Sequence, residues 1–600
     1  MSTAILTGPP VAASPIEGDL RTLGFDVLHA DGPGAVAAQL AALPAGERVA
    51  LVDPRFVGHV HALRLALTDP RFDAAAVPGA LSARPAARPA LVRVLADLPG
   101  DAPVDELAAR LDAEGTAVHR PELGVLVAAV PTGEVEREKA AAAVADVDDE
   151  VVRLRSAVKS RDGFFTTYFI SPYSRYIARW CARHGLTPNQ VTTASLLVAL
   201  IGAACAATGT RPGFIAAGVL LITSFVLDCT DGQLARYSLQ YSTLGAWLDA
   251  TFDRAKEYAY YAGLALGAAR GGDDVWALAL GAMVLQTCRH VVDFAFNEAN
   301  HDATALGELA GSSPTAALSG KLDSVGWTVW LRRMIVLPIG ERWALIAVLT
   351  AATTPRITFY VLIVGCAFAA CYTTGGRLLR SLTRRATCTD RAALALAELA
   401  DSGPLAEGVA AALRGPARRL PAFTAPAVAL LGAGVIIATS AFAPRGSWWP
   451  VLAAAGYVLT SGLAVARPLK GPLDWLVPPV FRAGEFTTIL VLAAVSQVNE
   501  ALPAAFGLVA AVAYHHYDTV YRIRGGTGAP PRALVRVIGG QEGRALVVTA
   551  ASAALAGGSG LTVALIALAV ALTVVVLTES IRFWVSSQAP AVHDETGEPA

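Results

Sequence analysis

Charged residues are scarce in this sequence. Only 16% of its 600 residues are Asp, Glu, Lys or Arg, whereas 54% are hydrophobic, and the mean hydropathy is +0.49. Soluble proteins carry about 25% charged residues, so a composition this apolar places much of the chain in lipid. The formal net charge of −1 gives no reason to expect nucleic-acid binding.

Cysteines are also few and irregularly spaced. The seven cysteines match neither a zinc site nor a disulfide framework, and we interpret them as reduced, packed thiols. The N-terminus, MSTAILTGPP, has no basic region followed by a long apolar run, so no cleavable signal peptide is visible. The first domain is therefore expected to stay in the cytoplasm.

The first 150 residues alternate short β-type runs with helical ones. The β-type runs cover residues 3–6, 25–29, 48–52 and 124–130. This alternation predicts a small α/β domain. A charged, alanine-rich stretch over 134–159 then predicts an amphipathic helix that links this domain to the membrane part.

Apolar stretches near the length needed to cross a bilayer recur in the remainder of the chain. We expect five or six between residues 424 and 582, and six in the middle of the chain, at residues 189–208, 212–230, 244–268, 274–296, 341–353 and 356–376. The predicted fold class is thus a multi-domain chain in which an α/β domain precedes an all-α polytopic membrane protein. Its domains are an α/β domain (1–150), a six-helix membrane domain (151–395) and a further helical membrane domain (420–590).

Arginine is unevenly distributed between the loops. Segments 377–420 and 519–544 are rich in arginine, whereas the alternate loops are short and carry about one arginine each. By the positive-inside rule the arginine-rich loops face the cytoplasm. With an N-terminal domain inside and an even number of spans, we expect a multi-pass protein of the cell membrane with both termini in the cytoplasm.

Four aspartates gather where the second and third spans meet. Asp228 and Asp231 are three residues apart at the end of one span, and Asp249 and Asp253 are four apart at the start of the next. These spacings put each pair on one helix face. Carboxylates at membrane depth are costly unless they are paired, hydrated or bound to a cation, and oxygen ligands select hard ions such as Mg²⁺ or Mn²⁺.

The residues between the aspartates also suit a bulky phosphate ligand. Gly232, Ala235 and Gly245 put little or no side chain in the way of a ligand or a neighbouring helix. Arg236 can bind phosphate in a bidentate manner.

Together these eight positions resemble the CDP-alcohol phosphotransferase signature (CDP-alcohol phosphatidyltransferase family). The resemblance implies transfer of a substituted phosphate group from a CDP-alcohol donor to an acceptor hydroxyl, with release of CMP. It implies that Asp228, Asp231 and Asp249 hold a divalent metal with the CDP diphosphate, and that Asp253 deprotonates the acceptor and contacts metal in some states. The CDP-binding residues that it implies are Asp228, Gly232, Ala235, Arg236 and Gly245. It also implies a homodimer and an active site on the cytoplasmic side.

A second resemblance concerns the acceptor. Residues 159–192 and 330–348 look like the corresponding segments of the branch that makes phosphodiester-linked inositol phosphates, which implies phospholipid or inositol-phosphate biosynthesis. Arg175, with Arg179 and Arg183 at four-residue intervals, either attracts anionic acceptors or fixes the depth of an interfacial helix. Thr187 is a plausible cap for a helix that begins at Pro188, and Asn189 is a candidate ligand.

Other polar residues leave two interpretations open. Arg289, His290 and Asp293 either line the acceptor pocket or form an internal ion pair between Arg289 and Asp293. Arg254 and Lys256, which follow the last aspartate, carry the same ambiguity. In the last part of the chain, His515, His516 and Asp518 fit a belt at the membrane interface better than a metal site.

The two flanking domains are harder to connect to chemistry. The N-terminal one is faintly similar to nucleotidyltransferases, with Asp53 after a strand, but it lacks their glycine-rich basic loop and is interpreted as degenerate. The C-terminal one looks like an actinobacterial extension of unknown activity. The rival interpretation of the whole chain is a non-catalytic transporter or scaffold with vestigial aspartates. A transporter predicts internal repeats between the membrane halves, and no such correspondence is visible in the sequence.

Overall fold

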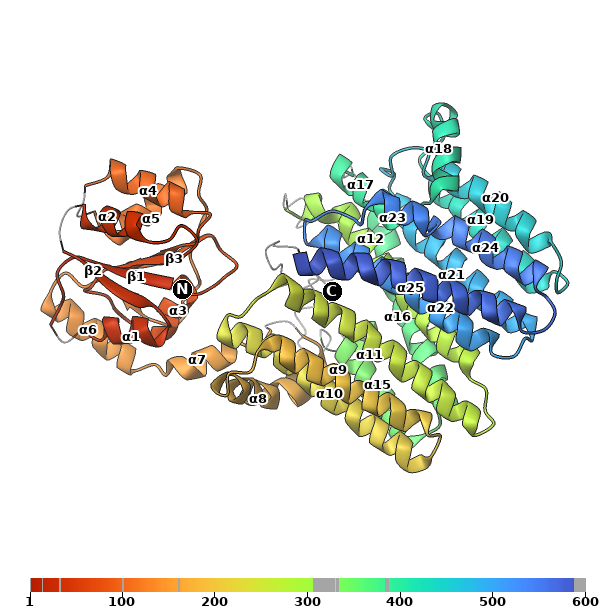
Figure 1. Cartoon of the computed structure of the whole chain (residues 1–600), viewed down its shortest axis with the longest axis horizontal. Helices are drawn as coiled ribbons and strands as arrows, with labels where there is room; N and C mark the ends of the chain where they lie inside the picture. The colour runs from red at the N-terminus through yellow and green to blue at the C-terminus, as the bar shows by residue number, and fades with distance from the viewer. Residues whose placement is uncertain are drawn as a thin grey trace. The chain divides into compact units, whose positions relative to one another are not determined.

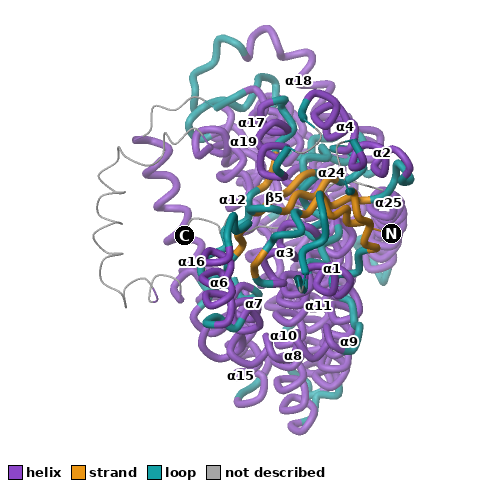
Figure 2. Tube along the Cα trace, turned by 90° about the vertical axis from the view of Figure 1, so that its left-hand side faces the viewer, coloured by secondary structure: helices purple, strands orange, loops and turns teal. Residues whose placement is uncertain are grey.

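The chain divides into two compact units in the computed structural model. The first unit comprises Met1–Ser160, Ser171–Gln190 and Cys229–Ser242, and the second comprises Arg161–Ile170, Val191–Asp228 and Thr243–Ala600. The structure describes residues 2–12, 14–31, 34–99, 102–159, 162–305, 330, 334–383 and 388–586. Every described strand belongs to the first unit, and the second is built from helices (Figure 2).

A six-stranded mixed sheet organises the first unit. Its order is β2-β1-β3-β6-β5-β7, with β1 parallel to β2 and β3, β5 parallel to β7, and β6 antiparallel to β3 and β5. The strands are β1 (Ser2–Thr7), β2 (Asp26–Ala30), β3 (Arg48–Val52), β5 (Ala74–Val77), β6 (Ala80–Ala83) and β7 (Val118–His119). Three of the four predicted β-type runs are therefore confirmed.

The fourth predicted run is largely wrong. Within residues 124–130 only β8 (Ala128–Ala129) is a strand, and it pairs with β4 (Val57–Gly58) in a separate two-stranded sheet. The sequence analysis also missed β5 and β6, because their alanine-rich sequences, AAAV and ALSA, lack the β-branched and aromatic residues that mark strands.

Helices cover both faces of this sheet (Figure 1). On one face α2 (Ala35–Ala42), α4 (Arg88–Asp97) and α5 (Val104–Ala113) pack on side chains that include Val49 and Leu51. On the other face α1 (Ile16–Thr22) and α3 (Val60–Leu67) pack on the alternate residues of the same strand, Ala50 and Val52. Alternate side chains of β3 thus face two separate hydrophobic cores, which is the pattern of a three-layer α/β/α domain.

The helix predicted over 134–159 is two helices. They are α6 (Glu134–Ala145) and α7 (Asp149–Ser156). Asp148 separates them because its carboxylate accepts hydrogen bonds from the backbone N–H groups of Glu150 at 3.0 Å and Val151 at 3.4 Å. An aspartate in this N-cap role begins a new helix, so the periodic charge pattern did not mean one continuous helix.

A helix is found at each of the six spans predicted for the middle of the chain. These helices are α9 (Pro188–Ala207), α10 (Arg211–Ser238), α11 (Thr243–Arg270), α12 (Trp276–Ala305), α15 (Ile339–Ala352) and α16 (Pro355–Thr383). Helix α10 continues well past the expected end near residue 230, because its polar final turns remain helical. All four aspartates of the predicted site are therefore helical residues.

The C-terminal part is equally helical within its described residues. After α17 (Asp390–Leu399) and α18 (Pro404–Ala417) come α19 (Thr424–Phe442), α20 (Trp449–Ala464), the short η2 (Asp474–Leu476), α21 (Val477–Ser496), α22 (Ala501–Arg524), α23 (Arg532–Val537), α24 (Gly540–Ala554) and α25 (Gly560–Ser586). Residues 384–387 of the first arginine-rich segment lie outside the described residues.

Six of the described helices are long and apolar enough to cross a membrane. They cover Pro188–Ala207, Arg211–Ser238, Pro355–Thr383, Thr424–Phe442, Asp474–Ser496 and Gly560–Ser586. Helices such as α11 and α22 carry more charged residues, and these charges belong to the clusters described below. The chain is thus a multi-domain, multi-pass membrane protein in which an α/β sheet domain precedes a helical membrane part.

Candidate metal and substrate site

Three of the predicted aspartates converge. Asp228 comes from α10, and Asp249 and Asp253 come from the first turns of α11. One carboxylate oxygen from each can be chosen so that all three lie within 4.8 Å of one another. Asp249 is exposed and the other two are half-buried. The four-residue spacing on α11 stacks its two carboxylates on one face, and α10 presents the third to the same point.

Lys256 completes this cluster. Its Nζ donates to the carboxylate of Asp228 and, at 3.2 Å, to that of Asp253, and its side chain is fully buried. One ammonium group thus offsets part of the repulsion among the three carboxylates. The sequence left Lys256 ambiguous, although its place three residues after Asp253, on the same helix face, was a usable signal.

The donor set fits a hard divalent cation. It consists of carboxylate oxygens alone, which is the chemistry that Mg²⁺ and Mn²⁺ prefer. Asp228 lies in the second half of α10 and the other two carboxylates lie near the start of α11, partly open to solvent, where a diphosphate can share the ion.

A buried ion network supports α11 behind the aspartates. Arg254 donates from Nη1 to Glu257 Oε2 at 3.0 Å, and Arg342 of α15 donates to the same oxygen at 3.1 Å. Tyr261 donates to the other oxygen of Glu257 at 2.7 Å. Arg254 also lies 3.2 Å from Nε2 of His290. These contacts settle the ambiguity at Arg254, because its guanidinium pairs within the helix bundle although it directly follows Asp253.

The remaining signature residues lie on the last turns of α10 and at the start of α11. Asp231 follows Asp228 by three residues and is buried, as is Ala235. Arg236 donates from Nε to the carbonyl of Ala157 at 2.6 Å, and a Cβ placed on Gly232 would come within 3.5 Å of its guanidinium. Gly245, the third residue of α11, is half-buried.

The predicted acceptor residues have other partners. Asp293 forms an ion pair with Arg377 of α16, and Arg289 donates to the backbone carbonyl of Val336. The alternative of an internal pair between Arg289 and Asp293 is therefore wrong, because α16 supplies the cation that the sequence of α12 alone could not show.

The predicted cap of α9 is confirmed. The Thr187 hydroxyl accepts a hydrogen bond from the Gln190 N–H at 3.4 Å, while the Gln190 side chain accepts one from the Thr187 N–H at 2.9 Å. This reciprocal pair is a capping box. Asn189 is the second residue of the helix that it begins, and it is half-buried.

Arg175 lies on α8 (Ser171–Arg183). Its guanidinium carbon is 5.1 Å from the centre of the Tyr176 ring. The other two arginines of the series, Arg179 and Arg183, lie 3.8 and 3.6 Å from Glu150. All three arginines therefore have partners within the first unit.

His515, His516 and Asp518 do not form an interface belt. All three are at most 2% exposed, inside the bundle of C-terminal helices. His515 lies 3.3 Å from Asp401, and Asp518 accepts hydrogen bonds from Ser580 and Trp584 at 2.8 and 2.6 Å. The belt interpretation is wrong because these residues occupy the inward face of α22, which the sequence of one helix does not reveal.

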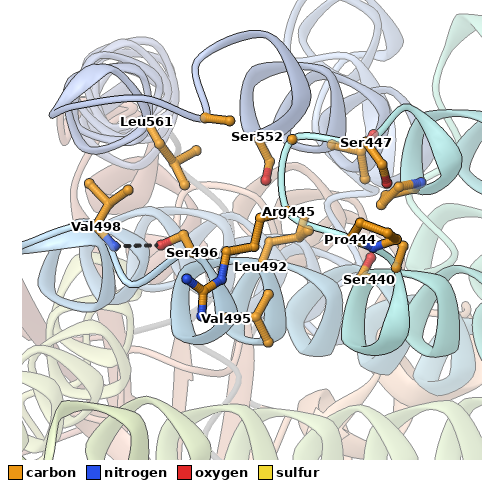
Figure 3. A pocket seen from close by; sticks show the side chains of 15 residues that line it. Ser440, Pro444, Arg445, Ser447, Leu492, Val495, Ser496, Val498, Ser552 and Leu561 are labelled. Atoms are coloured by element: carbon orange, nitrogen blue, oxygen red, sulfur yellow. Dashed lines mark hydrogen bonds between the residues drawn. The ribbon is translucent and has the colours of Figure 1, made fainter.

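A cavity in the C-terminal helices is too small to be a nucleotide site. Its volume is about 30 Å³, enough for about one water molecule. Figure 3 shows Arg445 among the lining residues, with Ser496 accepting a hydrogen bond from the Val498 N–H at 3.1 Å. None of the three converging aspartates lines this cavity.

Comparison with protein families divides the membrane part in two. Residues 185–370 match the family described as CDP-alcohol phosphatidyltransferase. Residues 390–600 match a family of unknown function, DUF5941. The first match contains the three converging aspartates and Lys256, and the second contains the buried His515, His516 and Asp518.

Curated relatives match this chain over 113 to 175 residues. An archaetidylinositol phosphate synthase of Pyrococcus horikoshii is 31% identical over 113 residues, which are 19% of this chain and 58% of the relative. A phosphatidylinositol phosphate synthase of Mycolicibacterium smegmatis is 36% identical over 122 residues, 20% of this chain and 53% of the relative. A bifunctional IPC transferase and DIPP synthase of Rubrobacter xylanophilus is 33% identical over 175 residues, 26% of this chain and 38% of the relative.

These matches cover part of each protein. The chain spans 58% of the length of the Pyrococcus relative and smaller shares of the other two. Residues 185–370 of this chain therefore form a domain that matches the CDP-alcohol phosphatidyltransferase family.

Proposed function

We propose that the chain transfers a substituted phosphate group from a CDP-alcohol to the hydroxyl of an acceptor alcohol and releases CMP. The observation that carries this proposal is the convergence of Asp228, Asp249 and Asp253 within 4.8 Å, on helices that match the family. In this reaction the acceptor oxygen bonds to the β-phosphorus, the bond from that phosphorus to the bridging oxygen breaks, and CMP leaves with the bridging oxygen.

Each aspartate has a role in this proposal. Asp228, Asp231 and Asp249 hold a divalent metal, with Asp253 able to join them, and Asp253 takes the proton of the acceptor hydroxyl. When bound, Mg²⁺ or Mn²⁺ neutralises charge on the diphosphate. Arg236 binds phosphate oxygens, and Gly232, Ala235 and Gly245 leave room for the CDP group.

Lys256 holds Asp253 in place for proton transfer. The ammonium is fixed by its burial and by its second bond to Asp228, so it fixes the orientation of the Asp253 carboxylate before substrate arrives. Preorganised charges of this kind are effective because they need no rearrangement during the reaction.

The names of the relatives support a choice of acceptor to test. The names of the two synthases above refer to inositol phosphate products, so an inositol phosphate is the first acceptor to test. Arg175, Asn189, Arg289 and Asp293 remain candidate acceptor or interface residues. A cytoplasmic active site with both termini on that side, a homodimer, and domain boundaries at 1–150, 151–395 and 420–590 stay predictions.

The test is CMP release by the full chain in nanodiscs with Mg²⁺ or Mn²⁺. CDP-diacylglycerol and CDP-inositol are supplied, each with and without inositol phosphate or glycerol phosphate. Asp253→Asn tests the site, and Asp390→Asn, at an exposed carboxylate, is the matched control. We expect one donor and acceptor pair to release CMP in the wild type and in the control only.

Absence of CMP release from every pair, by folded protein that binds Mn²⁺, would contradict the proposal for these substrates. The scaffold or transporter interpretation would then be tested next.

A further inference from the structure

The C-terminal membrane helices follow the same order as the central ones. Within the described residues, α8 precedes the six central helices. The similarly long α18 precedes α19, α20, α21, α22, α24 and α25, with only the short η2 and α23 between them. In both sets the fifth helix is short, with 14 residues in α15 and 15 in α24, and the sixth is long, with 29 residues in α16 and 27 in α25.

The third helices of the two sets share a sequence pattern. Residues 247–258 read WLDATFDRAKEY, and residues 475–486 read WLVPPVFRAGEF. Trp-Leu, Arg-Ala, Glu and a final aromatic residue recur at identical spacing. This places Trp475 opposite Trp247, Arg482 opposite Arg254 and Glu485 opposite Glu257.

The same ion network surrounds both glutamates. Arg482 donates to Glu485 at 3.0 Å, as Arg254 does to Glu257 at 3.0 Å. A second arginine then reaches each glutamate from the fifth helix of its own set. For Glu485 this is Arg544, with Nε 2.6 Å from Oε1; for Glu257 it is Arg342, with Nε 3.1 Å from Oε1. Buried charges are costly, so the same Arg–Glu–Arg arrangement on equivalent helices is not an incidental feature. The second set adds Asp401, which pairs with both Arg482 and Arg544.

A glutamate at the start of each fifth helix has an equivalent role. Glu341 accepts a hydrogen bond from the backbone N–H of Phe165, ahead of α8, at 3.3 Å. Glu542 accepts from the N–H groups of Gly403 and Ala406, at the start of α18, at 3.1 and 3.0 Å. In both sets the fifth helix thus holds the segment that leads into the preceding amphipathic stretch.

The contacts between the two sets are reciprocal. Helix α12 packs against α21, the equivalent pair α22 and α11 also pack together, and α12 packs against α22. Trp475 donates from Nε1 to Ser381 of α16, the sixth central helix, at 2.9 Å. Its counterpart Trp247 stacks with Trp584 of α25, the sixth C-terminal helix, with ring centres 6.2 Å apart. Such reciprocity is the mark of two like bodies related by a two-fold axis.

The metal ligands are what the second set lacks. Val477 and Phe481 stand where the first set has Asp249 and Asp253, and Gly484 stands where it has Lys256. Both replacements are at most 1% exposed, and α20, the counterpart of α10, contains no acidic residue.

We infer that the C-terminal membrane domain is a second copy of the six-helix fold of the central domain, without its metal ligands, and that it packs against the central domain as an internal partner. The second copy contacts the central helices that hold the site. Tyr517 of α22 places its ring 5.3 Å from the guanidinium of Arg254, the residue that follows Asp253, and 5.6 Å from the ring of His290. Helices of the second copy thus cover one face of α11 and of α12, so this contact lies within one chain.

Two cysteine pairs test this arrangement in the full chain. The first joins Phe296→Cys to Trp475→Cys, whose rings lie 5.3 Å apart, and the second joins Trp247→Cys to Trp584→Cys. Both are placed in a background without the seven native cysteines and treated with a short bifunctional maleimide in nanodiscs. We expect both pairs to cross-link within one chain, which native mass spectrometry and peptide mapping would show.

The single-cysteine variants are the controls. Cross-links between chains at either pair would overturn the inference, because a second chain would then occupy the shared face. Absence of both cross-links in folded protein would overturn it as well. Neither readout depends on CMP release, so failure of the proposed function is distinguishable from failure of this inference.

Metal binding supplies a second measurement that needs no change at the shared face. Mn²⁺ binding is compared between the wild type and the variant with Asp249→Asn and Asp253→Asn. We expect the double variant to lose the tight Mn²⁺ binding of the wild type. Tight binding that persists undiminished would place a metal site in the second copy and overturn the inference that it has none.

Discussion

The two membrane halves of this chain share a buried arginine–glutamate network but differ in the residues at the proposed metal site. In the central half the Arg254–Glu257–Arg342 network lies behind three carboxylates and a lysine. In the C-terminal half the matching Arg482–Glu485–Arg544 network lies behind Val477 and Phe481. The comparison separates two kinds of buried charge. The arginine–glutamate network belongs to the fold, because it persists without a metal site, whereas the aspartates belong to the proposed reaction.

The largest expected effect is confined to the central half. Asp253→Asn should lower CMP release by on the order of 10²–10⁴-fold, since it removes the proposed base. Asp390→Asn should leave the rate unchanged. A substitution of Val477 by Asn in the other half should also leave the rate within a few-fold of wild type in protein that folds, and a loss as large as that of Asp253→Asn would break the distinction between the halves. CMP release under saturating Mn²⁺ measures all three.

The ion networks should stabilise both halves. Glu257→Gln leaves two buried arginines without their shared carboxylate, at a cost of about 3–5 kcal/mol in the free energy of unfolding. Glu485→Gln should cost less, because Arg482 and Arg544 still pair with Asp401. Thermal unfolding in nanodiscs should show a loss of Tm for both variants, larger for Glu257→Gln, and none for Glu500→Gln, at an exposed position. If Glu485→Gln leaves Tm as unchanged as Glu500→Gln does, the second network is not a structural counterpart of the first.

Lys256 marks the most local difference between the halves, since its counterpart is Gly484. Lys256→Met removes a positive charge that lies 3.2 Å from Asp253. Mn²⁺ should then bind about tenfold more tightly, because a like charge is removed from beside the cation. Isothermal titration with Mn²⁺ measures the change, and Lys256→Arg, which keeps the charge, is the control. Weaker Mn²⁺ binding by Lys256→Met would show that the ordering of the carboxylates by the lysine outweighs its repulsion of the cation.

The smallest effect concerns the N-terminal sheet domain, which shares neither network. Burial, with a smaller contribution from Arg153, lowers the pKa of His61 to about 4. The unfolded chain, in which histidine has a pKa of about 6.5, therefore binds more protons between these values. The free energy of unfolding of this domain should fall as the pH drops from about 6.5 toward 4, by up to about 1.4 kcal/mol per pH unit.

Hydrogen exchange of the β3 amides, corrected for the intrinsic rate at each pH, measures this dependence. His61→Leu should flatten it, while the membrane helices should show no matching change. An unchanged slope in the variant would assign the pH dependence to another group.

Much of the fold was predictable from sequence because its signals are local. Strands β1 to β3 contain β-branched residues, and α9, α10 and α16 each contain a long apolar run. Strands β5 and β6 were missed because alanine-rich runs carry no strand signal. The helix break at Asp148 was missed because capping depends on the backbone conformation of one residue, and helical periodicity continues across it.

The candidate site also has one part that was predictable from sequence and one part that was not. The aspartate signature lies within 26 residues of sequence, from 228 to 253, so spacing alone identified it. The partners of Glu257 and Asp293 come from α15 and α16, some 84 or 85 residues away, and no local pattern points to them. The repeat between the halves escaped notice for a related reason: its most recognisable residues, the aspartates, are missing from the second copy.

The reciprocal tryptophan contacts have a consequence for how this interface can change over evolutionary time. In an assembly of two identical chains, every substitution at the shared face occurs twice, and both copies must tolerate it. Here each side is encoded separately, so one side can change while the other is kept. Trp247 faces Trp584 whereas its counterpart Trp475 faces Ser381, so the two ends of the interface have already diverged. The C-terminal half is thereby free to specialise in packing against the central half, while the central half keeps the residues of the proposed reaction.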